Sequence, residues 1–212
     1  MNNNRYKYPR TLHLPWSPGA GGDDKILENI ERFQGREVVV TEKLDGENTS
    51  MYQDHYHARS TDSKNHPSRN FVKQIWGRVR HDIPPGYRLC GENVYAVHSI
   101  KYTALPEYFM LFTVYDPDNL CLSGDETVEW AKLRELPAVP VLYRGVWDEE
   151  KVQACWTGKS LFGGDQEGYV VRVADAFPWA DHHMHFAKYV RAGHVQTDEH
   201  WMSQPVVPNQ LA

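Results

Sequence analysis

The segment Thr41-Glu-Lys-Leu-Asp-Gly-Glu-Asn48 places a lysine at the end of a β-branched run, directly before a turn. The run predicts a strand over Arg36–Lys43, and Asp45-Gly46 is a dipeptide typical of turns. A lysine held rigidly beside other cations and a metal ion has a lowered pKa, so that its amine can attack phosphorus or carbon. Taken alone, Lys-x-Asp-Gly is a short pattern, and a solvated lysine before a hairpin explains it better.

Three more charged residues interrupt apolar strand patterns. Glu92 lies within Arg88–Ser99, Glu167 opens the run Gly168-Tyr-Val-Val, and Lys188 is flanked by apolar residues. A charged group that is buried in such a strand needs a partner or a ligand. For each residue alone, a side chain that points to solvent is an equally good or better interpretation.

Strand signals dominate the segments that must position these residues. We predict strands over residues 36–43, 48–53, 56–60, 87–97, 107–115, 139–144, 167–173 and 184–190. Helices are predicted over 24–33, 125–136 and 148–156, and after Ser68, where apolar residues recur at helical spacing; residues 1–24 are predicted to be a loop. Because strands and helices do not alternate, we expect an α+β domain with antiparallel sheets and peripheral helices.

Composition excludes several classes of protein. The 212 residues carry a formal net charge of −5, which excludes binding of nucleic acid through global positive charge but not through a local basic patch. Hydrophobic residues make up 41%, so wholesale disorder is excluded. No apolar run approaches the ~18 residues of a membrane span, and the N-terminus has no secretory signal. Three separate cysteines favour a reduced, cytoplasmic protein. No membrane partner is expected.

The charged residues form an ordered series along the chain. The series is Lys43-Leu-Asp-Gly46, Arg59-Ser60, Gly91-Glu92, the aromatic strand Tyr108–Phe112, Glu167-Gly168 and Lys188. In this order it resembles motifs I, Ia, III, IIIa, IV and V of the covalent nucleotidyltransferases, which include RNA ligases, DNA ligases and mRNA capping enzymes. The chain is most similar to the RNA ligase 2 family over about residues 36–195. Glu42 before the lysine, Asn48 after it and Glu167-Gly-Tyr-Val carry that similarity.

The resemblance implies a nucleotidyltransferase domain with ATP between two antiparallel sheets. Lys43 would attack the α-phosphorus of ATP to form lysyl-AMP, and Lys188 would neutralise charge on that phosphate. The other implied ATP contacts are Glu42 at the adenine edge, Phe112 on the adenine face, Glu92 at the ribose and Arg59 at phosphate, together with Asn48 and Glu167. Tyr115 is the alternative to Phe112. Asp45, Glu92 and Glu167 would bind a hydrated Mg²⁺ or Mn²⁺ through its waters. This ion and Lys188 would favour a neutral Lys43.

Two features depart from the family pattern. Motif V usually carries two lysines one residue apart, but Val190 occupies the second position, so either Arg191 or a lysine elsewhere replaces it. About twenty residues follow motif V, which predicts a single nucleotidyltransferase domain over 1–212 without an appended OB-fold. We therefore expect the two RNA ends to be positioned by the substrate itself, as in a nicked duplex or other aligned ends, or by a partner protein.

A candidate nucleic-acid surface lies at Ser63–His81, which contains no acidic residue. Its basic residues are Lys64, Arg69, Lys73, Arg78 and Arg80. With the apolar residues Phe71, Val72, Ile75, Trp76 and Val79 facing inward, Lys73 and Arg80 face outward. This surface is equally well interpreted as a phosphate track and as an ordinary solvated helix face.

Two other patterns are rejected. Gly158-Lys-Ser160 resembles the end of a P-loop, but the glycine that this motif requires is replaced by Gln153. The histidines at 182, 183, 185, 194 and 200 suggest zinc, but the chain lacks both Cys-x-x-Cys and His-Glu-x-x-His. Solvated or RNA-facing histidines are therefore favoured. Trp76 and Trp201 fit either a core or a base-stacking role.

The sequence thus predicts an ATP-dependent RNA ligase that joins a 5′-phosphate to a 3′-hydroxyl. A DNA ligase core shares the lysyl-AMP chemistry, but Glu42 and Asn48 disfavour it, and they also disfavour a capping enzyme. The alternative of another class is a non-catalytic nucleotide-binding or RNA-binding module of the same fold. The joint presence of Lys43, Glu92, Glu167 and Lys188 argues against that module.

Overall fold

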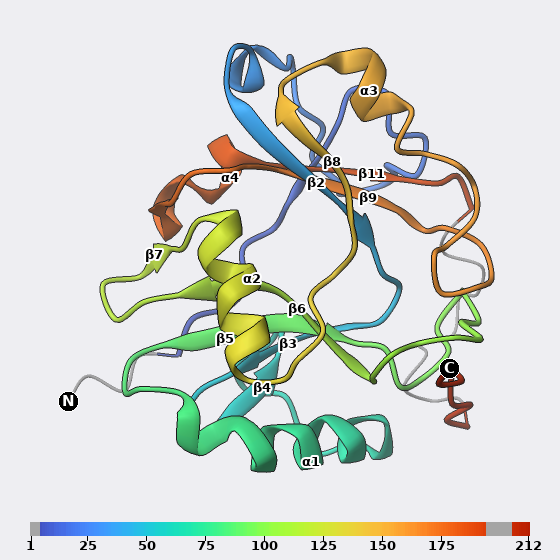
Figure 1. Ribbon diagram of the computed structural model, residues 1–212. Helices are drawn as coiled ribbons and strands as arrows, with labels where there is room; N and C mark the ends of the chain where they lie inside the picture. Colours follow the sequence, from blue (N-terminus) through green and yellow to red (C-terminus); the bar gives the residue numbers. More distant parts are fainter. Residues whose placement is uncertain (1–4, 194–204) are drawn as a thin grey trace.

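The computed structural model describes residues 5–193 and 205–212, which contain two β-sheets that face each other (Figure 1). The five-stranded sheet has the order β1 (Leu12–His13), β11 (Phe186–Val190), β9 (Gly168–Val173), β2 (Glu37–Lys43) and β8 (Val141–Val146). The six-stranded sheet has the order β10 (Phe177–Pro178), β7 (Leu120–Cys121), β6 (Phe109–Tyr115), β5 (Arg88–Asn93), β3 (Glu47–Met51) and β4 (Tyr56–Ala58). The predicted α+β class with two sheets is confirmed.

Strand register brings the charged motifs together. In the five-stranded sheet, Lys43 on β2 pairs with Gly168 on β9, and Lys188 on β11 pairs with Val170 on β9. In the six-stranded sheet, Asn48 on β3 pairs with Glu92 on β5. Since β2 and β3 are joined by the short turn 44–46, the two sheets converge where Lys43 ends its strand.

The N-terminal segment corrects two expectations. Leu12–His13 forms β1, and it pairs with β11 in parallel, whereas the other strand pairs within the described sheets are antiparallel. The helix predicted from residue 24 is wrong, since only the 3₁₀ turn Glu31–Phe33 forms. Instead, Leu27 donates its N–H to the carbonyl of His13 at 2.8 Å, so this segment follows β1 and not a helix.

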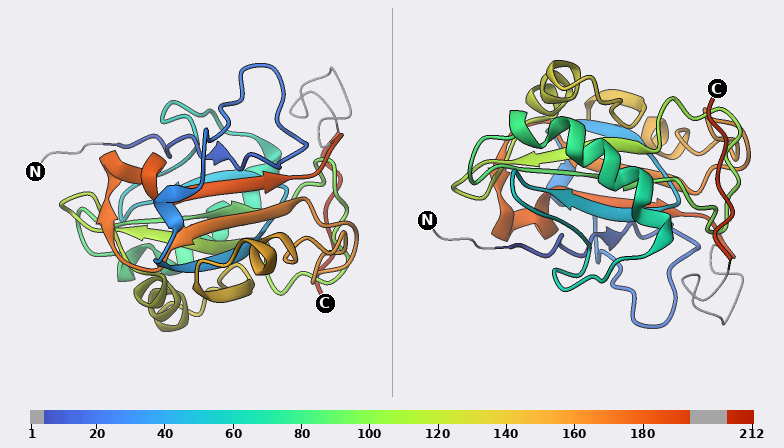
Figure 2. Two further views of the ribbon diagram at one scale, coloured as in Figure 1. Left: turned by 90° about the horizontal axis from the view of Figure 1, so that it is seen from above. Right: turned by 90° about the horizontal axis from the view of Figure 1, so that it is seen from below.

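The helices lie at the periphery. They are α1 (Asn70–Val79), α2 (Gly124–Leu133), α3 (Glu149–Gln153) and α4 (His182–His185). Figure 2 shows α1 across the outer face of the six-stranded sheet, where Val72, Ile75 and Val79 join a buried cluster with α2 and strands β3, β5 and β6. Phe71 was predicted to face inward but is partly exposed. It lies in the first turn of α1, at the edge of that cluster, where its ring contacts only Tyr95 and Tyr108 among the described aromatic residues.

The described residues contain no helix of the length and hydrophobicity that a membrane span needs. The three cysteines are free and buried, as the sequence predicts for reduced thiols.

His182 is buried, so its interpretation as a solvated or RNA-facing histidine is wrong. Its ring stacks on Phe186 at 4.4 Å between centroids and meets Tyr8 edge-on. Neither ring nitrogen has a hydrogen-bond partner in the described part of the chain. Burial, more than the nearby Arg172, lowers the pKa of His182 to about 3. His183 is exposed, and His194, His200 and Trp201 lie outside the described residues.

The burial of His182 predicts an acid-sensitive contribution to stability. Because His182 binds its proton more tightly when unfolded, its contribution to the free energy of unfolding should fall by about 2 kcal/mol between pH 7 and pH 5. The raised pKa values of Glu92 and Glu167 act in the opposite direction, so the test compares variants. Between pH 7 and pH 5, the change in the free energy of unfolding should differ by about 2 kcal/mol between the unmodified chain and His182→Phe, but not between the unmodified chain and His183→Gln. Urea unfolding at both pH values measures these changes, and the same change in His182→Phe as in the unmodified chain would contradict the assignment.

Candidate active site

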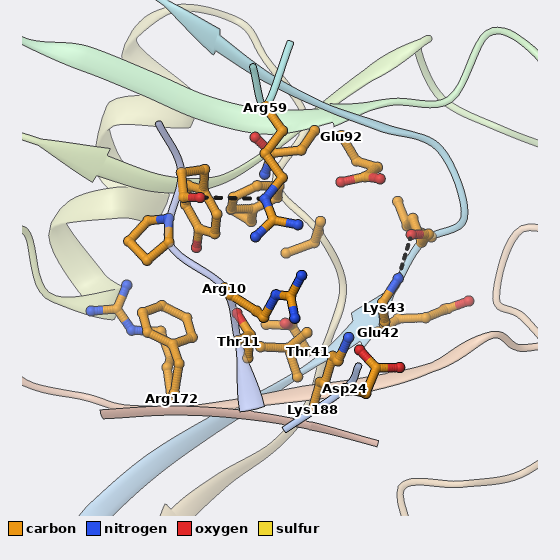
Figure 3. Close-up of a pocket in the computed structure, with 18 residues that line it drawn as sticks. Arg10, Thr11, Asp24, Thr41, Glu42, Lys43, Arg59, Glu92, Arg172 and Lys188 are labelled. Carbon is orange, nitrogen blue, oxygen red and sulfur yellow. Dashed lines mark hydrogen bonds between the residues drawn. The ribbon is translucent and has the colours of Figure 1, made fainter. Parts of the chain in front are cut away.

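A pocket of about 270 Å³ opens between the two sheets (Figure 3). Seven of the residues predicted from the sequence line it: Glu42, Lys43, Asn48, Arg59, Glu92, Phe112 and Lys188. They come from strands of both sheets and from the loop after β4. The fold therefore gathers the predicted motifs around one cavity.

Two glycines permit the close packing behind the pocket. A Cβ on Gly46 would collide with the carbonyl oxygen of Asn93 and crowd the side chain of Glu92. A Cβ on Gly168 would collide with the carbonyl oxygen of Tyr189. Glycine at these positions lets the turn after Lys43 and the start of β9 approach their neighbours.

Lys43 is held by carboxylates. Its Nζ lies 2.5 Å from the Oε2 of Glu167, and the Lys43 side chain is 24% exposed. Burial lowers the pKa of Lys43, but the Glu167 and Glu92 carboxylates outweigh it and raise the pKa above its usual value. The carboxylates therefore favour the ammonium form of Lys43, so the neutral form expected from the sequence needs a change in the charges around it.

Asp45 fixes the turn that follows Lys43. Its Oδ2 accepts hydrogen bonds from the Ser99 N–H at 2.6 Å, the Ser99 hydroxyl at 2.8 Å and the Ile100 N–H at 2.8 Å. One carboxylate oxygen is thus committed to the fold. Asp45 and Glu167 do not line the pocket itself but lie behind Lys43.

The carboxyl groups of Glu92 and Glu167 lie in a buried environment beside Lys43. Burial raises the pKa of Glu92 to about 8; Lys43 lowers it, and repulsion from Glu167 and Asp45 raises it further. Burial also raises the pKa of Glu167. Within the described residues, no group of three or more His, Cys, Asp or Glu side chains is arranged to hold a metal ion.

Two buried acceptors in the pocket have no partner among the described residues. The Oε2 of Glu42 accepts from the Leu161 N–H at 3.2 Å, but its Oε1 is unpaired, as is the Oδ1 of Asn48. A buried acceptor without a donor is costly, so both atoms fit a ligand that carries N–H or O–H groups.

Phe112 has the position that an aromatic ligand contact requires. It lines the pocket from β6, with Val170 on β9 of the other sheet, and Tyr8 meets its ring edge-on at 5.3 Å. Tyr115, the alternative, is fully buried under the guanidinium of Arg88 and does not line the pocket. Of the two residues predicted for stacking, Phe112 is the one that lines the pocket.

Four cations besides Lys43 line the pocket, and sequence reasoning identified two of them, Arg59 and Lys188. The two that the sequence did not predict are Arg10 and Arg172. Burial, and next repulsion from Lys43, lowers the pKa of Lys188. Arg191, the candidate for the missing motif V lysine, does not line this pocket; its guanidinium lies 3.4 Å from the Ser99 hydroxyl.

Four other missed lining residues come from the N-terminal segment: Tyr8, Pro9, Thr11 and Asp24. No motif or periodicity marks them, because long-range contacts alone bring this segment to the pocket.

The basic segment 63–81 is only partly available to a ligand. Arg69 lines an open groove beside Trp76, but it is largely buried and its charge is paired with Glu47. The guanidinium of Arg78 lies 3.4 Å from Glu107, and that of Arg80 stacks 4.3 Å from the ring centroid of Trp76. Lys64 and Lys73 line the same groove.

Comparison with known proteins supports the family that the sequence motifs indicate. The sequence model of a family described as RNA ligase matches residues 36–190. The chain belongs to the RNA ligase family. A search of curated protein sequences gave no match.

Solved RNA ligases share the fold. A Naegleria gruberi RNA ligase variant without ligand matches with a TM-score of 0.55 and 21% identity over 76% of this chain and 51% of that chain. A variant of the same enzyme with AMP and Mn matches with a TM-score of 0.54 and 21% identity, over the same shares of the two chains. An archaeal ATP-dependent RNA ligase matches with a TM-score of 0.50 and 16% identity over 77% and 45%.

This RNA ligase family member spans about half the length of the solved RNA ligases that it matches. The family match covers Lys43, Glu92, Glu167 and Lys188. It does not cover Arg10 and the rest of the N-terminal segment.

Proposed function

We propose that this chain is an ATP-dependent RNA ligase that forms a covalent lysyl-AMP and joins a 5′-phosphate to a 3′-hydroxyl. The observation that carries the proposal is the position of Lys43. Lys43 lines a nucleotide-sized pocket that other cations also line, and its amine is paired with Glu167 at 2.5 Å. A lysine nucleophile beside phosphate-binding cations is the arrangement that lysyl-AMP formation requires.

The adenosine would bind in the slot between the sheets. Phe112 and Val170 would contact the two faces of the adenine, and the unpaired Glu42 Oε1 would accept from its amino group. Asn48 would supply a second acceptor. Glu92 would hold the ribose hydroxyls, as the family resemblance implies.

The reacting phosphate would lie between Lys43 and Lys188. Arg59 would bind phosphate, and Lys188 would stabilise the extra negative charge of the transition state. Asp45, Glu92 and Glu167 would hold a hydrated Mg²⁺ or Mn²⁺ through its waters, and such an ion would offset phosphate charge. With that charge in place, Glu167 would no longer hold Lys43 as an ammonium.

The test is a sealing assay with ATP on nicked duplexes whose nick is flanked by RNA, by DNA or by one strand of each. We expect RNA with a 5′-phosphate and a 3′-hydroxyl to be sealed best. Preferred sealing of all-DNA nicks would establish the DNA ligase alternative. Binding of ATP with neither lysyl-AMP nor sealing would establish the non-catalytic module.

The open groove beside α1 is the proposed RNA-contacting surface. Lys64 and Lys73 line it together with His55, Tyr56 and Trp76, so exposed cations lie beside aromatic rings that bases can stack on. Neither lysine has an ion pair among the described residues.

Replacing Lys64 and Lys73 together with alanine should weaken RNA binding and flatten its salt dependence. Each lost phosphate contact should reduce the log–log slope by about 0.7–0.9. Lysyl-AMP formation needs no RNA and should be unchanged. The measurement is RNA affinity across a salt series, with Lys132→Ala on α2 as the control. Equal loss of RNA affinity and lysyl-AMP formation would contradict the assignment.

A further inference from the structure

Arg10 projects into the active-site pocket from a segment that precedes the family match. Figure 3 shows its guanidinium pointing into the cavity, toward Arg59 and Lys188. One of its nitrogens donates to the carbonyl of Asp23 at 2.9 Å, which fixes the side chain from behind. The pKa of Arg59 is lowered mainly by burial and next by repulsion from Arg10, so the two guanidinium groups lie close enough to interact.

The segment that carries Arg10 is attached to both sheets. On one side, Arg5 pairs with Asp54 at 2.9 Å and the Tyr6 N–H donates to the Tyr52 hydroxyl at 3.0 Å. On the other side, β1 pairs with β11. Arg10 lies between these attachments, so its backbone is held across the pocket and is not a free N-terminal tail.

The wall formed by Arg10, Arg59 and Lys188 has excess positive charge. None of the three side chains has an ion pair within the described part of the chain. Of the carboxylates nearby, Asp24 raises the pKa of Lys188 most, and it only partly offsets the lowering by burial and by Lys43. Three cations gathered without pairing carboxylates, on a chain of net charge −5, indicate a site for an anion of more than one charge.

We propose that Arg10, with Arg59, binds the β- and γ-phosphates of ATP and the pyrophosphate that leaves. This inference rests on the proposed function, because it extends the site of lysyl-AMP formation. In that step the Lys43 nitrogen forms a bond to the α-phosphorus and gives up a proton to solvent. The bond from the α-phosphorus to the bridging oxygen breaks, and pyrophosphate leaves with the electron pair.

The position of Arg10 matches this role. Lys43 and Lys188 mark the place of the α-phosphate, and Arg10 lies at the exposed rim of the pocket, on the route to solvent. A guanidinium binds phosphate oxygens in pairs, so it suits the leaving group of the reaction. The 5′-phosphate of RNA has the same chemistry and is the other source to be distinguished.

The experiment compares Arg10→Ala with Lys7→Ala, an exposed cation of the same segment that does not line the pocket. Calorimetry on the unmodified chain and both variants measures binding of AMP and of α,β-methylene-ATP, which Lys43 cannot cleave. Arg10→Ala should weaken binding of the triphosphate analogue by about tenfold and leave AMP binding unchanged. Lys7→Ala should change neither.

Two further measurements distinguish the β- and γ-phosphates of ATP from the 5′-phosphate of RNA as the group that Arg10 binds. In Arg10→Ala, release of ATP from preformed lysyl-AMP by added pyrophosphate should need a higher pyrophosphate concentration. Joining of pre-adenylylated RNA, which needs no ATP, should be unaffected. Equal losses for AMP and the analogue, no loss for either, or a loss confined to 5′-phosphorylated RNA would overturn the inference. If the unmodified chain binds neither nucleotide, the proposed function itself fails.

Discussion

Replacing Lys43 with arginine is expected to abolish transfer of AMP to the protein, by at least about three orders of magnitude. The guanidinium keeps the positive charge beside Glu167 but stays protonated at any working pH, so it has no free electron pair for phosphorus. Lys43→Ala should have the same effect. Incubation with α-labelled ATP followed by denaturing electrophoresis measures the covalent label.

The matched control is Lys159→Arg. Lys159 is an exposed lysine that also pairs with a carboxylate, Asp165 at 2.8 Å, but it lies outside the pocket. This variant should be labelled as the unmodified chain is. A normal yield of label in Lys43→Arg would show that another residue is the nucleophile.

Glu167→Gln is expected to reduce lysyl-AMP formation by about two orders of magnitude, the scale at which a residue that orients reacting groups contributes. The change keeps the shape of a side chain that is 6% exposed, but it removes the charge that holds Lys43 and that would attract a hydrated metal ion. Asp45→Ala should also reduce the yield, and EDTA should abolish it in the unmodified chain.

Asp165→Asn is the control for Glu167→Gln, since it removes an exposed carboxylate only two residues away. It should leave the yield of lysyl-AMP unchanged. Unimpaired labelling of Glu167→Gln, or full labelling of the unmodified chain in EDTA, would exclude the proposed roles of the carboxylates.

The sequence predicted the parts of the site that are local in the chain. Lys43 at a strand end, Glu92 within a strand and Lys188 between apolar neighbours are all readable as charges placed against an apolar pattern. Their order supplied the family resemblance, and the pairing of Lys43 with Gly168 explains why segments far apart in the sequence meet.

The parts that the sequence did not predict depend on distant partners. Arg10 belongs to a segment whose structure is set by pairing with β11, and a two-residue strand has no periodicity of its own. Arg69 looks like a surface cation in a basic run until Glu47, on β3, pairs with it. His182 has polar neighbours in sequence but is buried by Phe186 and Tyr8.

Mass spectrometry of the intact chain after incubation with ATP and Mg²⁺ shows whether Lys43 becomes covalently adenylylated. We predict a mass increased by one AMP, which is lost on addition of pyrophosphate and is located on Lys43 by peptide mapping. A chain that binds ATP but gains no mass, or that carries the AMP on a different residue, would contradict it.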